Sequence, residues 1–413
     1  MTNVYLHTFG CKANQYDTEL VRQALEDAGA TVVHDPARAD LAVVNSCTVT
    51  HTGEAKMRRL VRRLARGRPN GRTVVMGCAA AVDDGTIAAL PGVVRVVAGA
   101  DPAAVLGAFG LETTPVDRIL RRFRRGSRAW LKVQDGCDEH CTFCATTVAR
   151  GVNRSRPVAE LVEEAAGLAE HVDEIVITGV HIGSYGRDLG LSLGRLMERL
   201  VQRVPLVRFR LSSVEATEVE PALVDIMATA PNRLAPHLHA PLQSGSDPVL
   251  KRMGRHWYTA RAYRERIEAI AARVGAFALG ADVIVGFPGE SDADHRATRD
   301  LLATLPFTYA HVFPYSERPD AAARRLGPPV APAVARDRSA ELRALVADRG
   351  HAYVDTRVGA TADVVWLRRR AGVFDGLTED YLSVSLAADV PPRRLTGRLM
   401  RQGGDLTLAP IAA

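Results

Sequence analysis

The sequence lacks any apolar run that approaches the ~18 residues needed to cross a membrane. Its first residues show no basic segment followed by an apolar stretch, so we expect no secretory signal. Cysteine is scarce, with six residues in 413, and disulfides are not expected in a chain without secretory features. We therefore expect a soluble cytoplasmic protein with no membrane partner, whose cysteines serve metal binding or catalysis.

Two further absences narrow the function. No G-x4-G-K-[ST] motif occurs, so the sequence gives no support to nucleotide hydrolysis. Lysine is rare and occurs only at Lys12, Lys56, Lys132 and Lys251, whereas arginine is abundant. The net charge of +6 suits a polyanionic partner such as RNA, although codon bias explains the arginine excess equally well.

Three cysteines in the middle of the chain share one short loop. Cys137, Cys141 and Cys144 have the spacing C-x3-C-x2-C, which allows a single loop to direct all three thiolates to one point. A 4Fe–4S cluster held by three thiolates keeps one iron open to a ligand that is not protein. The alternative is a zinc site with His140 or a distant residue as fourth ligand, but no C-x2-C pair elsewhere supports it.

The first 115 residues alternate strand-like and helical patterns. The strand-like segments are residues 4–6, 41–44 and 73–76, and the helical segments are residues 17–28 and 54–66. This order predicts an α/β domain with a parallel, doubly wound sheet.

Each of these predicted strands is followed by a cysteine, in the order Cys11, Cys47 and Cys78. Ligands bind at the carboxyl ends of the strands in such sheets, so the three thiols should converge on one edge. One cysteine at a strand end is more often a small buried hydrophobe, but three in the same position favour a second metal site.

A partial (β/α)6 barrel is predicted next, at residues 130–350. The strand-like segments are residues 130–134, 174–178, 207–211, 237–239, 281–285 and 309–313. Helical patterns separate them, for example at residues 158–170, 247–253 and 259–274. Chemistry in such barrels takes place at the carboxyl ends of the strands.

Two regions flank the predicted barrel. Residues 116–129 are rich in arginine, which fits either an arm that contacts phosphates or a solvated connector. Residues 354–413 contain short strand patterns separated by turns, which predict a small antiparallel β-barrel.

The cysteine motifs resemble those of a known enzyme family. The spacing of the central triple is similar to the signature of the radical SAM enzymes. Residues 8–14 (TFGCKAN), 45–50 (NSCTVT) and 76–78 (MGC) resemble the amino-terminal domain of the radical SAM methylthiotransferases. The resemblance extends over essentially the whole chain and assigns all six cysteines to two triples.

The resemblance implies two 4Fe–4S clusters. Cys137, Cys141 and Cys144 would hold the catalytic cluster, which binds S-adenosylmethionine (SAM) and splits it to a 5′-deoxyadenosyl radical. Cys11, Cys47 and Cys78 would hold an auxiliary cluster, whose open iron carries the sulfur destined for the substrate. The implied regions are a methylthiotransferase domain (1–115), a basic linker (116–129), a radical SAM domain (130–350) and a TRAM-like, RNA-binding domain (354–413).

Contacts with SAM are implied for six residues: Phe143, Gly179, Ser213, Glu215, His239 and Gln243. Residues 281–290 and 312–316 resemble family segments near the SAM adenine. One departure follows the central cysteines, at residues 145–151 (ATTVARG), where the family commonly has two apolar residues and a proline before Arg-Gly. We expect this departure to change packing below the SAM pocket or the fit of the substrate.

The substrate implied by the resemblance is tRNA. Residues 45–53, 241–255 and 311–315 look most like the enzymes that convert N6-threonylcarbamoyladenosine at position 37 to its 2-methylthio form. A reductase or flavodoxin-type electron donor and an unidentified sulfur donor are implied as partners. The alternatives are a sister enzyme acting on isopentenyladenosine-37, one acting on a ribosomal-protein aspartate, and a zinc-dependent RNA-binding protein without catalysis.

Overall fold

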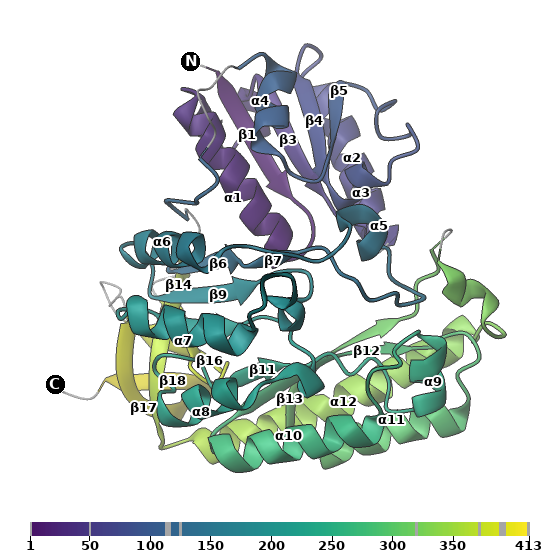
Figure 1. The fold of residues 1–413 in the computed structure, drawn as a ribbon, viewed down its shortest axis with the longest axis vertical. Helices are drawn as coiled ribbons and strands as arrows, with labels where there is room; N and C mark the ends of the chain where they lie inside the picture. The colour runs from purple at the N-terminus through teal and green to yellow at the C-terminus, as the bar shows by residue number, and fades with distance from the viewer. Residues whose placement is uncertain are drawn as a thin grey trace.

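The structure is a computed structural model, in which three parts follow one another along the chain (Figure 1). It describes residues 2–48, 51–111, 117–123, 126–318, 321–370, 373–387 and 394–410. Val49 and Thr50 of the second cysteine motif and the predicted boundary at residues 115 and 116 lie outside the described residues. None of the helices in the described ranges is long and apolar enough to cross a membrane.

A five-stranded parallel sheet forms the first part. Its strands are β1 (Asn3–Thr8), β2 (Thr31–Val33), β3 (Leu41–Ser46), β4 (Arg72–Gly77) and β5 (Val93–Ala98). Their order is β2-β1-β3-β4-β5, and all pairs are parallel. The central strand β3 is buried on both faces, which its continuous apolar run predicts.

Helices cover both faces of this sheet. They are α1 (Lys12–Asp27), α2 (His51–Gly67), α3 (Cys78–Ala81) and α4 (Pro102–Phe109). Helices α1 and α4 share one apolar core with the sheet, and α2 and α3 share the other. The predicted doubly wound domain is confirmed, and both predicted helices are present with slightly different ends.

Six parallel strands in chain order form the second part. They are β6 (Arg128–Lys132), β9 (Glu174–Thr178), β10 (Arg208–Leu211), β11 (His237–His239), β12 (Ala278–Val285) and β13 (Phe307–Pro314). Two three-stranded sheets, β10-β9-β6 and β11-β12-β13, meet between β10 and β11. There the Phe209 N–H donates to the Arg233 carbonyl (2.7 Å) and the Val214 N–H to the His239 carbonyl (3.0 Å). The six strands therefore form the predicted partial barrel.

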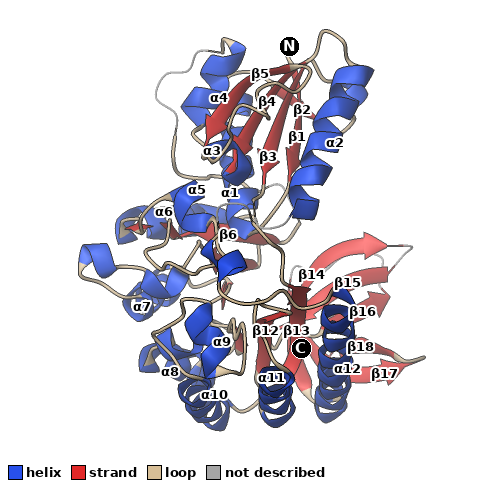
Figure 2. Cartoon of the chain, turned by 90° about the vertical axis from the view of Figure 1, so that its right-hand side faces the viewer, coloured by secondary structure: helices blue, strands red, loops and turns tan. Residues whose placement is uncertain are grey.

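Helices pack outside this barrel (Figures 1 and 2). They are α6 (Val158–Ala169), α7 (Leu193–Arg203), α8 (Pro221–Thr229), α9 (Asp247–Arg252), α10 (Ala260–Val274), α11 (Asp292–Thr304) and α12 (Pro332–Arg357). The short helix α5 (Thr146–Arg150) lies instead against α3 of the first part. The long helix α12, which packs against β13, was not predicted. In the described part of the arginine-rich linker, Leu120 and Phe123 are buried in the core of the barrel, whereas Arg118, Arg121 and Arg122 are exposed.

The third part is a closed five-stranded barrel. Its strands are β14 (Thr361–Arg370), β15 (Val373–Thr378), β16 (Ser383–Ala387), β17 (Arg394–Gln402) and β18 (Asp405–Pro410), in the order β14-β15-β16-β18-β17. The predicted small barrel is confirmed, with the difference that β16 and β18 pair in parallel. Its apolar interior includes Trp366, Phe374 and Leu399.

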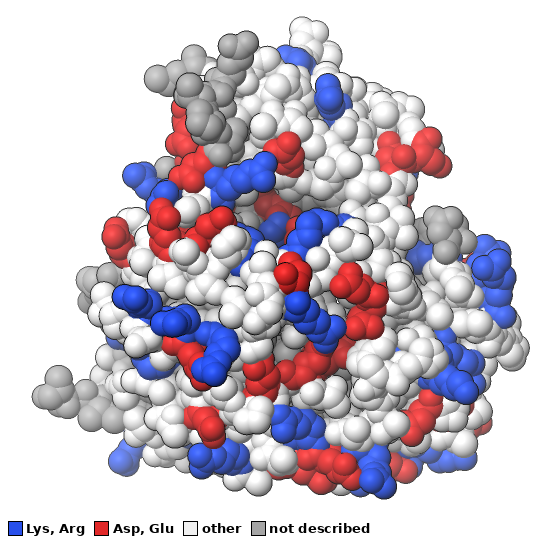
Figure 3. Space-filling model, in the orientation of Figure 1, with Lys and Arg blue, Asp and Glu red and all other residues white. Residues whose placement is uncertain are grey.

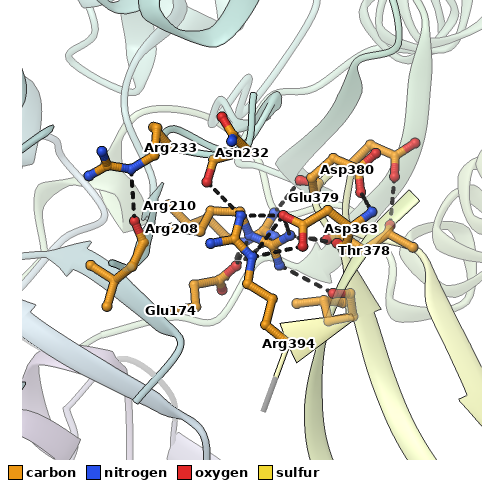
Figure 4. Close-up of polar contacts among 12 residues, drawn as sticks. Glu174, Arg208, Arg210, Asn232, Arg233, Asp363, Thr378, Glu379, Asp380 and Arg394 are labelled. Atoms are coloured by element: carbon orange, nitrogen blue, oxygen red, sulfur yellow. Dashed lines mark hydrogen bonds and ion pairs between the residues drawn. The ribbon is translucent and has the colours of Figure 1, made fainter. Parts of the chain in front are cut away.

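A buried ionic cluster joins this barrel to the second part (Figure 4). Glu174 is fully buried and accepts hydrogen bonds from Arg208 (2.7 Å) and Arg210 (2.9 Å). Arg208 also reaches Asp363 (3.1 Å), and Arg210 donates to the Thr378 carbonyl (2.9 Å). The excess positive charge of the two arginines is thus satisfied by the C-terminal barrel, whose docking completes the cluster.

A turn of the C-terminal barrel also enters the base of the partial barrel. Tyr381, at φ +69°, stacks on His237 with ring centroids 4.2 Å apart. The Arg210 guanidinium lies 5.3 Å from the Tyr381 ring centroid, within cation–π range. His237 hydrogen-bonds to the Tyr309 hydroxyl (2.8 Å), which also contacts His239 (3.0 Å). Stacked rings therefore connect the barrel base with the strand ends above it.

Candidate active site

The loop that carries the central cysteines is held at several points. It follows β7 (Gln134–Asp135), which pairs with β8 (Arg154–Ser155) where the chain returns. The Cys137 N–H donates to the Gly151 carbonyl (3.0 Å), and the Thr142 N–H donates to the Met253 carbonyl (2.9 Å). The loop is thus fixed to the top of the barrel by backbone hydrogen bonds at both ends.

The three thiols of this loop lie close to one another. Burial, together with the neighbouring Cys144 and Cys137, raises the pKa of Cys141 to about 12, against the opposing effect of Arg255. The Cys141 Sγ lies 3.5 Å from Arg255 Nη1. A bound metal deprotonates such thiols, so the group fits a cluster whose thiolates need a nearby cation.

The other three cysteines also converge. Cys11 precedes α1, Cys47 follows β3, and Cys78 begins α3, each at a carboxyl strand end. The Sγ atoms of Cys11 and Cys78 lie 3.9 and 3.7 Å from Asn14 Oδ1. Asn14 in turn donates to the carbonyls of Phe9 and Ser46 (both 2.9 Å) and so ties the cysteine loops together.

Gly10 is required at the centre of this triple. Its φ is +108°, and a side chain there would lie 3.2 Å from the Cys47 Sγ. Burial raises the pKa of Cys78, with Cys11 and Cys47 adding to this effect and Arg150 opposing it. All six cysteines lie in the described residues and none is in a disulfide. The sulfur-only donor set, with three thiols in each triple, fits two iron–sulfur clusters, each with an open iron.

One arginine lies between the two triples. Arg150, from the helix that follows the central cysteines, places Nε 3.2 Å from the Cys78 Sγ. Its guanidinium also pairs with Asp17 (2.9 Å) and Asp135 (3.1 Å), and it contacts Asn14. Lys132 joins this group by pairing with both aspartates. Asp135 has its pKa lowered to about 2, because Lys132 and Arg150 outweigh the effect of burial.

A cavity of about 570 Å³ opens beside the central cysteines, a size that suits a small ligand. The first domain contributes Thr48 and Thr52, and the cysteine loop contributes residues 143–146. The remaining lining residues come from the ends of β12 and β13 and the segments near them: Gln243, Asp282, Ile284, Phe313, Pro314, Tyr315, Ser316 and Arg318. The Tyr315 hydroxyl is buried and has no hydrogen-bond partner within the described ranges.

Two of the predicted SAM contacts, Phe143 and Gln243, line this cavity. Gln243 has a left-handed backbone (φ +61°), which lets its N–H donate to the Asp282 carbonyl (2.8 Å). His239 lies behind the cavity, with Nε2 3.2 Å from Asp282. Burial alone would raise the pKa of Asp282, but His239 and His311 hold it well below its usual range.

The other predicted contacts, Gly179, Ser213 and Glu215, do not line the cavity in the described structure. Packing explains the glycine at position 179, because a side chain there would lie 2.8 Å from the Gln134 carbonyl. Ser213 is exposed. Glu215 is buried and accepts from Arg255 and from Trp257 Nε1, next to Cys141.

Sequence reasoning missed four residues at this site: Asn14, Arg150, His181 and Arg255. His181 Nδ1 lies 3.8 Å from the Cys137 Sγ, and its Nε2 contacts Glu218 (2.8 Å). A signal existed for Arg150, which belongs to the Arg-Gly pair after the central cysteines. Thr146, within the departure at residues 145–151, lines the cavity, so this departure lies at the site itself.

Comparison with known proteins identifies the reaction class. Residues 3–99 match the family described as uncharacterized protein family UPF0004, and residues 131–302 match the radical SAM superfamily. The chain is similar in fold to the radical SAM methyltransferase TsrM from Kitasatospora setae, solved with cobalamin and a [4Fe–4S] cluster. That similarity has a TM-score of 0.52, 16% identity, and covers 76% of this chain and 75% of TsrM.

Curated relatives match over nearly the full length. The threonylcarbamoyladenosine tRNA methylthiotransferase MtaB of Bacillus subtilis is 34% identical, over 93% of this chain and 90% of its own. MtaB of Thermotoga maritima is 35% identical, over 92% and 91%. The tRNA-2-methylthio-N(6)-dimethylallyladenosine synthase of Acidithiobacillus ferrooxidans is 32% identical, over 94% and 92%.

Identity of this level over nine-tenths of both chains establishes a common fold and reaction class. The chain is a transferase, and its cofactors are SAM and 4Fe–4S clusters, of which this family carries two. With both cysteine triples and both matching domains in place, the chain belongs to the radical SAM methylthiotransferases.

Proposed function

We propose that this enzyme adds a methylthio group to C2 of N6-threonylcarbamoyladenosine at position 37 of tRNA. The observation that carries the proposal is one cavity lined both by the central cysteine loop and by the residue that follows Cys47. Thr48, next to Cys47, and Cys144 line the same space. A nucleotide bound there would be within reach of sulfur from one side and of a radical from the other.

The residues that would hold each group follow from their positions. Cys137, Cys141 and Cys144 would bind the catalytic cluster, and Cys11, Cys47 and Cys78 the auxiliary one. With SAM bound, the catalytic cluster supplies a radical strong enough to activate an unreactive aromatic C–H bond, which no ordinary general base could deprotonate. Arg255 and Arg150 would supply positive charge beside the thiolates, and Phe143 and Gln243 would contact SAM. The cavity walls would exclude water from the reacting atoms.

The cavity favours the threonylcarbamoyl substrate over the isopentenyl one. Threonylcarbamoyl carries a carboxylate, whereas isopentenyl is apolar and uncharged. Among the residues that line the cavity, Arg318 is the one with a positive charge. It is largely buried and contacts the Thr48 carbonyl, with Glu54 3.8 Å away. An arginine there can pair with the substrate carboxylate. This pairing would hold the threonylcarbamoyl group near the first domain.

The domain division proposed here follows the cysteines and the barrels. Residues 1–115 would carry the auxiliary cluster, residues 130–350 the SAM chemistry, and residues 354–413 an RNA-binding barrel, with residues 116–129 between the first two. A cytoplasmic location and a reductase or flavodoxin-type electron donor belong to the same proposal. The sulfur donor is an unidentified partner.

Anaerobic turnover with SAM and dithionite on two tRNA pools tests this function. One pool carries threonylcarbamoyladenosine and the other isopentenyladenosine, and mass spectrometry of the nucleosides reads the product. A methylthio product from the first pool alone is the expected result. Product from the second pool alone would overturn the substrate, and SAM cleavage without product from either would redirect the search to the ribosomal protein. Stoichiometric zinc without iron would overturn the reaction itself.

A further inference from the structure

Helix α2 (His51–Gly67) concentrates positive charge on one side of the first domain. It carries six Lys and Arg residues and a single acid, Glu54, within 17 residues, whereas the whole chain has 53 basic and 47 acidic residues. Met57, Leu60, Val61 and Leu64 are buried and pack on the sheet, so they fix which side of the helix faces outward. The charge is therefore a local feature of this helix and not an average property of the chain.

The exposed cations form a stripe that begins at the active-site cavity. Thr52, Lys56, Arg59, Arg63 and Arg66 are spaced by four, three, four and three residues, which places them on one face of a helix. All five are exposed, and Thr52 also lines the active-site cavity. At 1.5 Å per residue, the stripe runs about 20 Å from that cavity.

These cations are available to an external anion. Arg58, on the flank of the same helix, is occupied by Glu54 (2.9 Å) and Thr86. By contrast, Lys56, Arg59, Arg63 and Arg66 have no ion pair with any residue in the described ranges. Four unpaired like charges along one face repel one another, and this arrangement is stabilised when a polyanion lies along them.

An aromatic hollow adjoins the stripe. A second cavity, of about 300 Å³, is lined by His7, Phe9, Lys56, Arg59, Leu60 and Arg63. The rings of His7 and Phe9 are 4.5 Å apart between centroids. Aromatic rings beside cations are typical of surfaces that stack a nucleobase while they hold the backbone.

We infer that this stripe, named here the α2 stripe (Lys56, Arg59, Arg63 and Arg66), binds the phosphate backbone of the substrate RNA next to the modified nucleotide. A backbone held along it would have one end at Thr52, where the cavity receives the base. Figure 2 shows α2 and the C-terminal barrel on the same side of the molecule, so one RNA can contact both. The inference rests on the proposed function for its partner, tRNA. An acidic protein partner such as an electron donor is the competing occupant, but it has no need of a stripe that begins at the nucleotide cavity or of an aromatic hollow.

Binding of an unmodified anticodon stem-loop RNA by the full, cluster-loaded enzyme tests the α2 stripe without reference to catalysis. Fluorescence anisotropy would be recorded between about 50 and 200 mM salt for R59Q/R63Q and, independently, for K56Q/R66Q. Each pair should lower the affinity about tenfold and reduce the slope of log K against log salt by about 1.5, because two phosphate contacts are lost. Retained thermal unfolding would show that the variants fold.

R199Q/R203Q is the matched control. Both residues are exposed on α7 of the second part, away from α2. The face of the molecule drawn in Figure 3 carries Lys and Arg interspersed with Asp and Glu. This variant loses the same charge and should bind RNA like the wild type. If both α2 variants bound RNA with wild-type affinity and salt slope, the inference would be overturned. The proposed function would be tested separately, by the product assay on tRNA. Normal RNA binding combined with lost turnover on a flavodoxin, but not on dithionite, would instead assign the stripe to the electron donor.

Discussion

Arg150 Nε lies 3.2 Å from the Sγ of Cys78, although 72 positions separate the two residues. Arg150 belongs to the helix after the central cysteines, whereas Cys78 belongs to the first domain. The same guanidinium is held by Asp17 of the first domain and Asp135 of the second. The contact therefore fixes the distance between the two thiol triples, and its loss should affect sulfur transfer more than SAM cleavage.

Replacement of Arg150 tests this coupling. In Arg150→Gln the two aspartates keep Lys132 but lose their arginine, and the auxiliary thiolates lose their cation. We expect methylthio product to fall more than tenfold while reductive cleavage of SAM continues, since a buried pair broken on one side costs about 3–5 kcal/mol. Arg150→Lys keeps the positive charge but lacks the guanidinium that can bind both aspartates at once. Its methylthiolation activity should lie between those of the wild type and Arg150→Gln. Equal loss of both activities would contradict a role specific to the auxiliary triple.

Single cysteine replacements separate the two triples. Cys47→Ala should abolish methylthiolation yet leave SAM cleavage, because only the auxiliary triple loses a ligand. Cys141→Ala should abolish both activities. Iron analysis of each reconstituted variant should give about four iron atoms per chain, against about eight in the wild type. Methylthio product from Cys47→Ala would show that the assignment of the first triple is wrong.

Replacement of Arg318 tests substrate selection. Arg318→Gln removes the cation in the cavity without removing its hydrogen-bonding capacity. Turnover of threonylcarbamoyladenosine tRNA should fall ten- to a hundredfold, since a hydrogen bond to a charged group contributes about 1.5–3 kcal/mol. Cleavage of SAM without tRNA should be unchanged, and this provides the internal control. Unaltered kcat/KM on the modified tRNA would exclude a pairing between Arg318 and the substrate carboxylate.

The ionic cluster at Glu174 predicts acid sensitivity. Burial alone would raise the pKa of Glu174, but Arg210, Arg128 and Arg208 hold it well below its usual range. A depressed folded-state pKa contributes stability that is present above the unfolded pKa of about 4.3 and is lost as pH falls. The free energy of unfolding of Glu174→Gln should therefore be about 3–5 kcal/mol lower than that of the wild type at pH 7, and this difference should become smaller at low pH. Denaturant unfolding at several pH values measures both, and a difference independent of pH would contradict the ionised state.

The sequence predicted those features that depend on local pattern. Strands β1, β3 and β4 of the first part, the six strands of the partial barrel and the strand-end positions of Cys11, Cys47 and Cys78 follow from local pattern, and the structure agrees. The short strand β2 and the edge strand β5 were not predicted. Helix α12 was missed because its arginines interrupt the apolar spacing. Its buried Arg338 pairs with Glu290, which lies far away in the sequence. Long-range charge partners of this kind leave no local pattern.

The active site was predicted less completely than the fold, for the same reason. Cysteine spacing reveals ligands, but Asn14 and Arg150 acquire their roles only where two domains meet, more than 130 positions apart. Gly179, by contrast, was predicted as a SAM contact, but its close approach to Gln134 is explained by chain packing. A motif resemblance identifies the neighbourhood of a site, whereas the partner of each side chain depends on tertiary structure.

The Tyr381 turn sets an order of assembly during translation. Ribosomes produce the partial barrel before residues 361–410, so Arg208, Arg210 and His237 emerge well ahead of the groups that satisfy them. Until Tyr381 arrives, the base of the barrel remains open to water and its charges lack carbonyl partners. A nascent enzyme stalled before this turn should therefore be a substrate for chaperones and proteases.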